Sequence, residues 1–527
     1  MMKVLVLDGV EEEGLQALRR EPDIEVDIPN KLTEDQLVGI IGEYDGMIVR
    51  SATKVNARVL EHATKLKVVG RAGVGVDNID LAAATAKGVL VVNAPGGNTI
   101  AAAELTMAMM QSLARNIPQA NATLRSGKWD KKSFMGVELR GKVLGVIGLG
   151  RIGSAVAKRA QGMEMRVVAY DPYITEENAA ILGVKLLSLE EIFKQSDFIT
   201  VHLPLTRESK YLLDEKAFET MKQGVRIINC ARGGIIKESA LYEAMKSGKV
   251  AGAALDVFEK EPNTDSPLFE FNNFIATPHL GASTQEAQLL VAVDVAEEIV
   301  AALKGEPVKN TVNIPSLSPK TMAVVRPYLS LAEKMGKFVA QLVAGRIKKI
   351  EITYDGDLAN QEVSPITTAV IKGFLDTILQ EMVNYVNAPL LARDRGISVV
   401  QKQAGEGSDY ANLITVKAAS DKEELSVSGT IFGRTDPRIV SIDGYHVDAF
   451  PEGHMLYIPH IDKPRIIGPV GNLIGAHNIN ISAMQVGRLK IGGKAVMLLS
   501  VDAPVPAETL AEIAKIDGVL GVKNVSL

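Results

Sequence analysis

The first 300 residues alternate short apolar runs with longer segments of helical periodicity. Apolar runs bounded by Gly, Asp or Asn predict buried parallel strands, and the segments between them predict crossover helices. The predicted strands are Lys3–Leu7, Met47–Arg50, Lys67–Gly70, Val89–Val92, Val143–Ile147, Arg166–Tyr170, Phe198–His202, Val225–Asn229, Ala253–Val257 and Phe274–Ala276. These are more strands than one doubly wound sheet usually holds, so the pattern predicts two Rossmann-like or flavodoxin-like α/β domains.

Two Ala-rich segments with helical periodicity separate these domains. Residues 97–120 predict a long helix with Asn98 or Thr99 near its N-cap, and residues 283–304 predict a second. A helix that leaves one domain and another that returns make the first domain discontinuous. We therefore expect one domain from residues 1–97 and 284–306, interrupted by a second from residues 98–283.

The pattern changes after residue 306. Residues 307–320 are rich in Pro, Asn and Ser and predict a linker. Residues 311–450 begin helical and become β-rich, which predicts an α+β intervening domain. Residues 454–527 follow a β-α-β-β-α-β order, which is typical of a small ferredoxin-like domain.

Composition limits the kinds of partner. The net charge of −5 gives no electrostatic reason to expect nucleic acid or a membrane surface as a partner. The single cysteine, Cys230, excludes a disulfide within the chain, and the scattered histidines predict no metal site. Apolar runs are too short for a signal peptide or a membrane span, so a cytoplasmic location is expected.

A glycine motif lies between the predicted strand Val143–Ile147 and a helical segment. Its spacing, G-x-G-x-x-G, is typical of a turn whose backbone approaches a pyrophosphate at a helix N-terminus. Asp171 ends the next predicted strand, where a carboxylate binds the ribose 2′-hydroxyl and repels a 2′-phosphate. The unit therefore predicts NAD rather than NADP as cofactor. The residues expected to bind it here are Gly148, Gly150, Arg151, Ile152, Gly153 and Asp171.

Three further clusters follow predicted strands: residues 229–234, 256–262 and 277–282. Carboxyl ends of strands are where open α/β sheets bind ligands. Together with the glycine motif and Asp171, these clusters resemble the D-2-hydroxyacid dehydrogenase family. The resemblance implies that Arg232 pairs with a substrate carboxylate and that His279, polarised by Glu261, is the general acid/base. This chemistry suits the side chains, since Arg grips a carboxylate bidentately and His titrates near neutral pH.

Each of these residues also has an ordinary structural interpretation. Arg232 could form a surface ion pair, Glu261 could stabilise a helix N-terminus, and His279 could lie in a core. The resemblance further implies a nicotinamide side of the site, whereas Cys230 could equally be a small buried hydrophobe. It also places His202 near the adenosine. The residues implied on this side are Cys230, Ala231, Arg232, Asp256, His279, Gly281 and Ala282.

The N-terminal half resembles the phosphoglycerate dehydrogenase branch of the family in residues 49–55, 70–80 and 128–136. That resemblance implies a substrate with a carboxylate and a phosphate, which Arg50, Arg71, Lys131 and Lys132 suit. It implies that the backbone at Val74 and Gly75 faces the carboxylate opposite Arg232. It also implies that residues 128–136 reach a neighbouring subunit of a dimer or tetramer. The Lys131–Lys132 pair could instead be a solvated charge pair.

The tail, from His460 to Ile481, resembles an ACT regulatory domain, an amino-acid-sensing module. Asp462 and Asn480 match effector-binding positions, and the resemblance implies L-serine as an effector. Arg465, however, follows Pro464 where effector-binding members usually have Gly, and its bulk could block a ligand. In the intervening domain, Arg434 and Arg438 fit ordinary surface arginines, with an anion site as the alternative.

The resemblance implies NAD-dependent oxidation of 3-phospho-D-glycerate to 3-phosphohydroxypyruvate, the first committed step of L-serine biosynthesis. Two alternatives stay open. A glyoxylate or hydroxypyruvate reductase would not need Arg50, Lys131 and Lys132, nor the long tail. A non-catalytic NAD-sensing corepressor could keep the same Arg, Glu and His residues.

Overall fold

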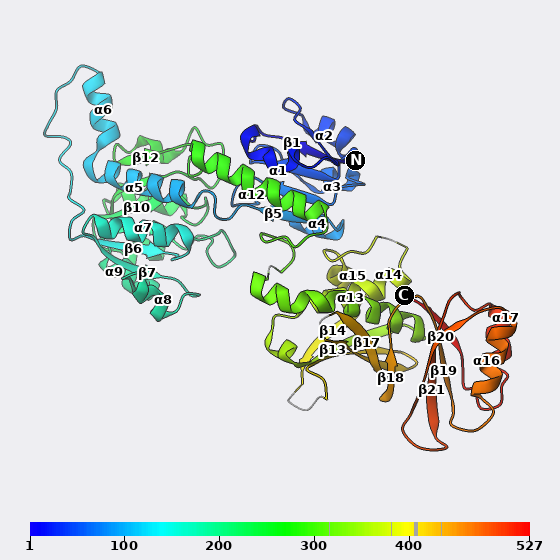
Figure 1. Ribbon diagram of the computed structural model, residues 1–527. Coiled ribbons are helices and arrows are strands. Elements are labelled where there is room, and N and C mark those ends of the chain that lie inside the picture. Colours follow the sequence, from blue (N-terminus) through cyan, green and yellow to red (C-terminus); the bar gives the residue numbers. More distant parts are fainter. Residues whose placement is uncertain (316, 381, 405–408, 434) are drawn as a thin grey trace.

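The computed structural model describes residues 1–315, 317–380, 382–404, 409–433 and 435–527, which form four β-sheets (Figure 1). Two α/β units contain the N-terminal 300 residues, and two further units follow at the C-terminal end. The α/β class with an α+β and a ferredoxin-like unit is the fold class that the sequence predicts. The exact domain boundaries stay a prediction.

The first sheet is wholly parallel, with the order β2-β1-β3-β4-β5. Its strands are β1 (Met2–Val6), β2 (Ile24–Asp27), β3 (Gly46–Val49), β4 (Val68–Arg71) and β5 (Leu90–Asn93). Its helices are α1 (Gln16–Arg19), α2 (Glu34–Ile40), α3 (Ala57–His62), α4 (Leu81–Ala86) and α12 (Gln285–Leu303). Helix α12 packs on β4 and β5, so the chain returns to this sheet after the second one.

The second sheet is also parallel, with the order β12-β11-β10-β9-β6-β7-β8. Its strands are β6 (Val143–Ile147), β7 (Arg166–Tyr170), β8 (Lys185–Leu186), β9 (Phe198–Val201), β10 (Val225–Asn229), β11 (Val250–Leu255) and β12 (Phe274–Ala276). Its helices are α5 (Thr99–Arg115), α7 (Arg151–Gly162), α8 (Glu176–Ile181), α9 (Leu189–Gln195), α10 (Glu215–Thr220) and α11 (Glu238–Lys246). The carboxyl ends of β6, β10, β11 and β12 bring the three predicted clusters and the glycine motif to one edge.

The predicted helix over residues 97–120 is two helices. Helix α5 ends at Arg115, Asn116 adopts a left-handed conformation with φ of 52°, and α6 (Ile117–Arg125) begins after it. Asparagine tolerates this conformation, and Pro118 fits the first turn of a new helix. Helix α6 protrudes at the end of the molecule far from the first sheet (Figure 1). The apolar periodicity continues across the break, and Pro118 is the residue in the sequence that marks it, because a proline inside a helical pattern ends or kinks the helix before it.

The third sheet has the order β14-β13-β15-β16-β17-β18 and is antiparallel except for the β13–β14 pair. Its strands are β13 (Ile347–Gly356), β14 (Ser398–Gln403), β15 (Asn412–Ser420), β16 (Glu424–Phe432), β17 (Asp436–Ile442) and β18 (Tyr445–Ala449). Its helices are α13 (Pro319–Leu342), α14 (Ser364–Ile378) and α15 (Ala388–Asp394). Arg434 lies outside the described residues. Arg438 pairs with Asp436 at 3.0 Å and Asp448 at 3.5 Å, which favours the surface interpretation.

The fourth sheet has the antiparallel order β20-β21-β19-β22 of a ferredoxin-like fold. Its elements are β19 (His454–Ile461), α16 (Ile467–Ala476), β20 (Ile481–Arg488), β21 (Lys494–Val501), α17 (Ala507–Ile513) and β22 (Lys523–Ser526). Alternate residues of β19 and β21 face opposite sides. Leu456 and Leu499 pack under α16 and α17, whereas Tyr457 and Leu498 join the core of the third sheet. The last two sheets therefore share one apolar core.

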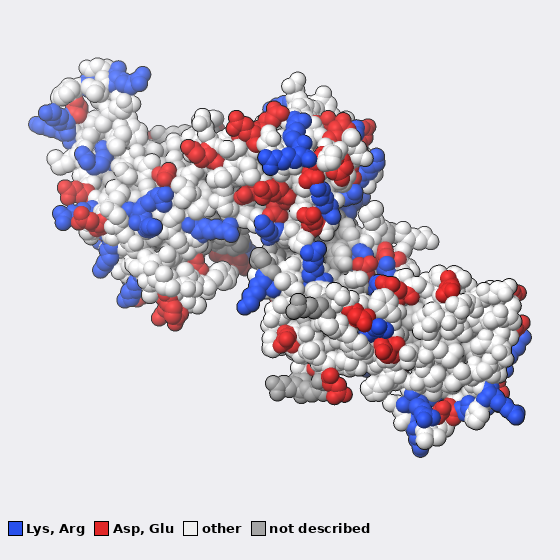
Figure 2. Space-filling model, viewed as in Figure 1, with Lys and Arg blue, Asp and Glu red and all other residues white. Residues whose placement is uncertain are grey.

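Charge is mixed on the surface. Figure 2 shows Lys and Arg side chains interspersed with Asp and Glu over the visible face. Among the described residues, no helix is both long and apolar enough to cross a membrane.

Candidate active site

The glycine turn between β6 and α7 has the geometry that the motif predicts. Gly148 has a φ of 94°, which favours glycine, and its amide donates to the Tyr170 carbonyl at 2.8 Å. A side chain on Gly153 would place Cβ 2.0 Å from the Gly148 carbonyl oxygen, so α7 approaches the turn closely. Gly150 faces open space at the first turn of α7, where Arg151 and Ile152 follow. The turn leaves room for a pyrophosphate at the positive end of a 12-residue helix.

Asp171 is tied to this turn. One carboxylate oxygen accepts the Leu149 amide at 2.8 Å, and the other accepts the Tyr173 amide at 2.9 Å. Each oxygen keeps a free lone pair for a hydroxyl donor, so the carboxylate is compatible with a ribose 2′-hydroxyl. A 2′-phosphate in the same place would face this negative charge, and NAD therefore fits the turn better than NADP.

His202 follows β9 on the other side of the turn. Its Nε2 lies 3.0 Å from Thr200 Oγ1, while its buried Nδ1 has no hydrogen-bond partner among the described residues. Burial lowers the pKa of His202 to about 4, so the ring is neutral at physiological pH. An unpaired buried ring nitrogen close to the glycine turn is compatible with the predicted contact to the adenosine half of the cofactor.

His279 and Glu261 form the pair that the resemblance implies. His279 Nδ1 lies 2.7 Å from Glu261 Oε2, and the Phe258 amide donates to Oε1 of the same carboxylate at 3.0 Å. Partial burial opposes ionisation of Glu261, but the hydrogen bonds from His279 and Phe258 and the nearby charge of Arg232 lower its pKa overall. The ionised carboxylate fixes Nδ1 as the protonated nitrogen and leaves Nε2 for proton transfer.

Asp256 holds the loop of His279 through hydrogen bonds. This carboxylate is fully buried and accepts hydrogen bonds from Thr277 Oγ1 at 2.6 Å, the Leu280 amide at 2.7 Å and the Gly281 amide at 2.9 Å. Burial nevertheless raises its pKa. Its own carbonyl accepts the His279 amide at 2.9 Å, and His279 has a φ of 56°. Asp256 therefore orders the loop that presents His279, Gly281 and Ala282.

Arg232 faces the first sheet across the cleft. A Cβ on Gly75 would lie 2.0 Å from Arg232 Nη2, so the guanidinium lies directly over the Gly75 backbone. Arg232 Nε also lies 3.3 Å from Asp77 Oδ2, and its Nη1 donates to the Ala231 carbonyl at 2.7 Å. Arg232 and the loop at Val74 and Gly75 therefore meet, as the resemblance implies. The contact with Asp77 was not predicted from the sequence.

Arg71 contributes a second cation to the same place. Its side chain folds over Gly73, where a Cβ would lie 1.5 Å from Nη1, and its buried Nε has no partner among the described residues. Burial, and then the positive charge of Arg232, lower the pKa of Arg71 to about 10, with Arg50 adding to the effect. Guanidinium groups held close to each other and incompletely paired are typical of a site for an anion.

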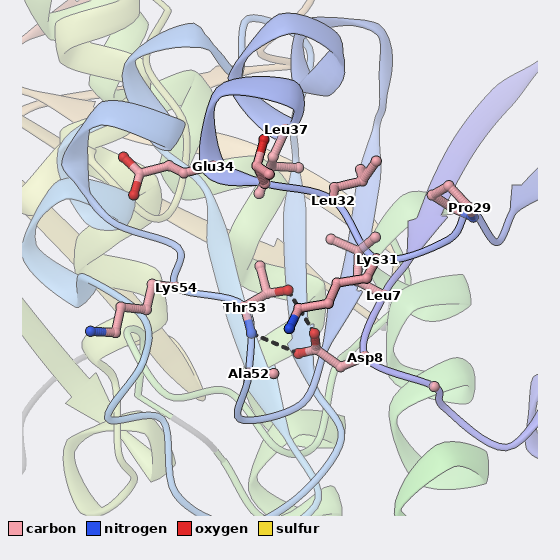
Figure 3. Close-up of a pocket in the computed structure, with 12 residues that line it drawn as sticks. Leu7, Asp8, Pro29, Lys31, Leu32, Glu34, Leu37, Ala52, Thr53 and Lys54 are labelled. Carbon is pink, nitrogen blue, oxygen red and sulfur yellow. Dashed lines mark hydrogen bonds between the residues drawn. The ribbon is translucent and has the colours of Figure 1, made fainter. Parts of the chain in front are cut away.

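The backbone of Arg50 is fixed by Asp8. Asp8 Oδ2 accepts the amides of Arg50 at 2.9 Å and Thr53 at 3.0 Å, and Oδ1 accepts the Thr53 hydroxyl at 2.7 Å. Figure 3 shows the two Asp8–Thr53 bonds in a hollow of about 470 Å³ between α2 and the ends of β1 and β3. Asp8 was not predicted from the sequence, because the backbone groups that it binds are more than 40 residues away along the chain.

Cys230 fits the structural alternative. It is buried, its Sγ lies 3.4 Å from Met109 Sδ, and burial raises the pKa of its thiol to about 12. The neighbouring Ala231 amide donates to Asn229 Oδ1 at 2.9 Å, and Asn229 Nδ2 donates to the Arg232 carbonyl at 2.9 Å. Asn229, to which no motif in the sequence points, therefore shapes the loop that carries Arg232.

Two predicted pairs lie outside this cleft. Lys131 and Lys132 are exposed in the loop after α6, and Lys131 Nζ lies 5.9 Å from the centre of the Trp129 ring. Asp462 accepts from Arg488 Nη1 at 3.1 Å, whereas Asn480 donates to Asp502 at the other end of β20. The register of β19, β20 and β21 therefore does not bring Asp462 and Asn480 together within one chain. Arg465 has a φ of 68°, a conformation that favours the glycine usual at this position.

Comparison with known proteins identifies the family. The model of the D-isomer specific 2-hydroxyacid dehydrogenase NAD binding domain matches residues 107–281, and that of the D-3-phosphoglycerate dehydrogenase intervening domain matches residues 324–443. A D-3-phosphoglycerate dehydrogenase of Archaeoglobus fulgidus is 47% identical and one of Bacillus subtilis 46%, both over 100% of each chain. The apo-structure of D-lactate dehydrogenase from Escherichia coli has 31% identity and a TM-score of 0.53, and covers 59% of this chain and 100% of that one. The chain therefore belongs to the NAD-dependent D-2-hydroxyacid dehydrogenase family, in its D-3-phosphoglycerate dehydrogenase branch.

Proposed function

We propose that this enzyme oxidises 3-phospho-D-glycerate to 3-phosphohydroxypyruvate, the first committed step of L-serine biosynthesis. The observation that carries the proposal is the meeting of the His279–Glu261 pair with Arg232 and Arg71 at one cleft. Oxidation of the substrate hydroxyl needs a proton acceptor. The carboxylate and the phosphate of the same small molecule need several cations to bind them.

In this mechanism Arg232 binds the substrate carboxylate against the Gly75 backbone. His279 Nε2 accepts the proton of the C2 hydroxyl, and Glu261 stabilises the resulting imidazolium through Nδ1. NAD, bound at the glycine turn, supplies the hydride acceptor. Asp256 keeps the His279 loop in place, and Arg71 and Arg50 offer positive charge to the phosphate. In the reverse direction His279 returns the proton to the carbonyl oxygen.

The site residues away from the cleft stay part of the proposal. Residues 128–136, with Lys131 and Lys132, would reach the substrate of a neighbouring copy in a homodimer or homotetramer. L-Serine would bind at the last domain, where Asp462 of one copy would need Asn480 of another. Arg465 argues against that effector, because its side chain stands where a glycine is usual. We also propose a cytoplasmic location.

A steady-state assay tests the main proposal. The expected result is that the enzyme forms NADH from 3-phosphoglycerate and NAD. It should reduce glyoxylate only slowly when NADH is supplied. Turnover of glyoxylate without activity on phosphoglycerate would instead assign a reductase. No turnover of either substrate, together with tight NADH binding, would favour the cofactor-sensing alternative. For the effector, calorimetry with L-serine on the wild-type chain and on Arg465→Gly measures whether the arginine prevents binding.

A further inference from the structure

A second hollow, of about 540 Å³, lies between the first unit and the third-sheet unit. One wall is formed by Thr85 on α4 and by residues 313–315 of the linker. The opposite wall is formed by α14, α15 and β14. Its volume is within the range of sites that hold small organic molecules, roughly 300–1,000 Å³. It is lined by none of the residues that form the catalytic cleft between the first and second sheets.

The two walls are fixed by hydrogen bonds. Asn313 donates to Thr85 Oγ1 at 3.1 Å and to the Val89 carbonyl at 2.9 Å, and accepts the Val91 amide at 2.9 Å. On the other side, Asn384 Nδ2 donates to the Gly88 carbonyl at 2.8 Å. The Asn313 bonds hold the linker on the first unit, and the Asn384–Gly88 bond joins the third-sheet unit to the end of α4.

The surface of the hollow is mostly apolar, and its charge is positive. Among the described lining residues Arg393 is the only charged one, and the adjacent Asp394 lies 3.3 Å from its Nη2. Glu333 approaches from outside to accept the Tyr385 hydroxyl at 2.9 Å. The apolar lining residues are Ile314, Pro315, Ile371, Val386, Pro389, Leu390, Ile397 and Val399.

One polar group in the wall has no partner. Ser364 Oγ is buried and makes no hydrogen bond among the described residues. The neighbouring Thr367 Oγ1 is already occupied by the Tyr354 hydroxyl and Gln401 Nε2, each at 2.7 Å, so it does not satisfy Ser364. A buried hydroxyl without a partner is unfavourable. Rotation of the Ser364 side chain toward the hollow would let a ligand atom supply the missing hydrogen bond.

We propose that this hollow is a binding site for a small organic acid with an apolar body. The branched side chains would cover the body, Ser364 would hydrogen-bond a polar atom of the ligand, and Arg393 at the rim would attract the carboxylate. A phosphorylated substrate does not suit the site, because a dianion finds only one cation there, and that cation is shared with Asp394.

The site is connected to the catalytic cleft through α4. Asp80 caps this helix by accepting the Ala83 amide at 3.0 Å, and the loop with Val74, Gly75 and Asp77 directly precedes it. Thr85, near the other end of α4, lines the hollow. A ligand that bridges Thr85 and Ser364 would therefore hold the helix that follows the substrate-facing loop.

Calorimetry on the full chain tests the site with three probe acids: octanoate, 4-phenylbutyrate and indole-3-propionate. At least one should bind with one site per chain, and 4-phenylbutan-1-ol should bind more weakly than 4-phenylbutyrate. Leu390→Trp, which fills the hollow, should weaken binding by about tenfold or more, equal to ~1.4 kcal/mol. Arg393→Gln should weaken the acid by about two- to fivefold and leave the alcohol unchanged, as for an exposed ion pair.

Ser364→Ala should weaken both the acid and the alcohol. Met382→Trp, an equally large change at an 80% exposed side chain outside the hollow, is the matched control and should bind like the wild type. The proposal is overturned if no acid binds, if the alcohol binds as tightly as the acid, or if Ser364→Ala and Arg393→Gln bind as the wild type does. These last two variants decide the matter even if Leu390→Trp does not fold. None of these measurements depends on turnover of phosphoglycerate.

Discussion

The catalytic cleft and the boundary between the last two sheets are both contacts between folded units, but they differ in chemistry. In the cleft, Arg232 lies over Gly75, and Arg71 keeps an unpaired Nε. At the other boundary, Tyr457 and Leu498 of the fourth sheet lie in the core of the third, together with Phe338. The cleft is polar and incompletely satisfied, whereas the boundary is apolar and well packed.

The difference separates binding from stability. Buried cations without full partners destabilise the free protein and are stabilised when an anion arrives, so they are typical of a site. Close-packed apolar side chains contribute to the free energy of unfolding whether or not a ligand is bound. Substitutions in the cleft should therefore change activity with little loss of stability, and those at the boundary should do the reverse.

The largest effect is expected for His279→Ala. Removal of the proton acceptor should lower turnover by about 10²–10⁴, equal to roughly 2.7–5.5 kcal/mol of barrier. The free energy of unfolding should fall by less than about 1 kcal/mol, because the His279 side chain is about half exposed, at 49%, and so is only weakly stabilised by Glu261. His62→Ala, a substitution at a histidine on α3, is the control in the same steady-state assay. Unchanged rates for His279→Ala would remove it from the mechanism.

Leu498→Ala tests the boundary. This side chain is 1% exposed, and its truncation should destabilise the protein by about 2–5 kcal/mol in denaturant unfolding. The kcat/KM of the protein that stays folded should match the wild type, since the cleft is unaffected. A loss of kcat without a loss of stability would contradict the distinction between the two regions.

Arg71→Met tests whether a cleft residue affects substrate binding without stabilising the free protein. Loss of charge-assisted hydrogen bonds to the substrate should raise KM for phosphoglycerate by about 10–100-fold, for roughly 1.5–3 kcal/mol. The same change removes a buried charge close to Arg232, so the melting temperature without substrate should rise. Arg58→Met, an exposed arginine paired with Asp35, should change neither quantity. A fall in melting temperature for Arg71→Met would show that Arg71 is structural.

The smallest effect is expected from acid titration of Glu261. Its folded-state pKa is below the ordinary value, so its contribution to stability is present above the unfolded pKa of about 4.3 and is lost as pH falls through the lowered value. Glu261→Gln should remove this part of the pH dependence, by under about 1 kcal/mol since the side chain is partly exposed. Urea unfolding of both proteins between neutral pH and pH 3 measures it. Identical pH profiles would show that the His279 contact does not stabilise the carboxylate.

Much of the fold follows from local signals in the sequence. Strands β6, β7, β10 and β12 have the predicted bounds because apolar runs and turn residues coincide there. Strands β2 and β8 were missed. In β2 (Ile24–Asp27) two apolar residues alternate with two charged ones, so there is no continuous apolar run, and β8 (Lys185–Leu186) is only two residues long. The shared core of the last two sheets was also missed, since periodicity marks an apolar face without naming what covers it.

The site divides in the same way. Gly148, Arg232, Glu261 and His279 belong to motifs, so the sequence identifies them and the fold brings them to one cleft. Asp77, Asn229 and Asp8 act through single contacts whose partners are distant in sequence or depend on a loop's shape. The separation of Asp462 from Asn480 likewise depends on strand register, which a motif does not contain.

The apolar core that the last two sheets share decides how this chain can be shortened. A protein cut at residue 453 would lose Met455, Tyr457, Val496, Leu498 and Val525 from the core around α13 and would expose the surface that they cover. The fourth sheet alone would expose the matching face. The last two sheets are thus one cooperative unit rather than two exchangeable modules. A trimmed enzyme should end within the linker before α13, and a transplanted sensor should begin there.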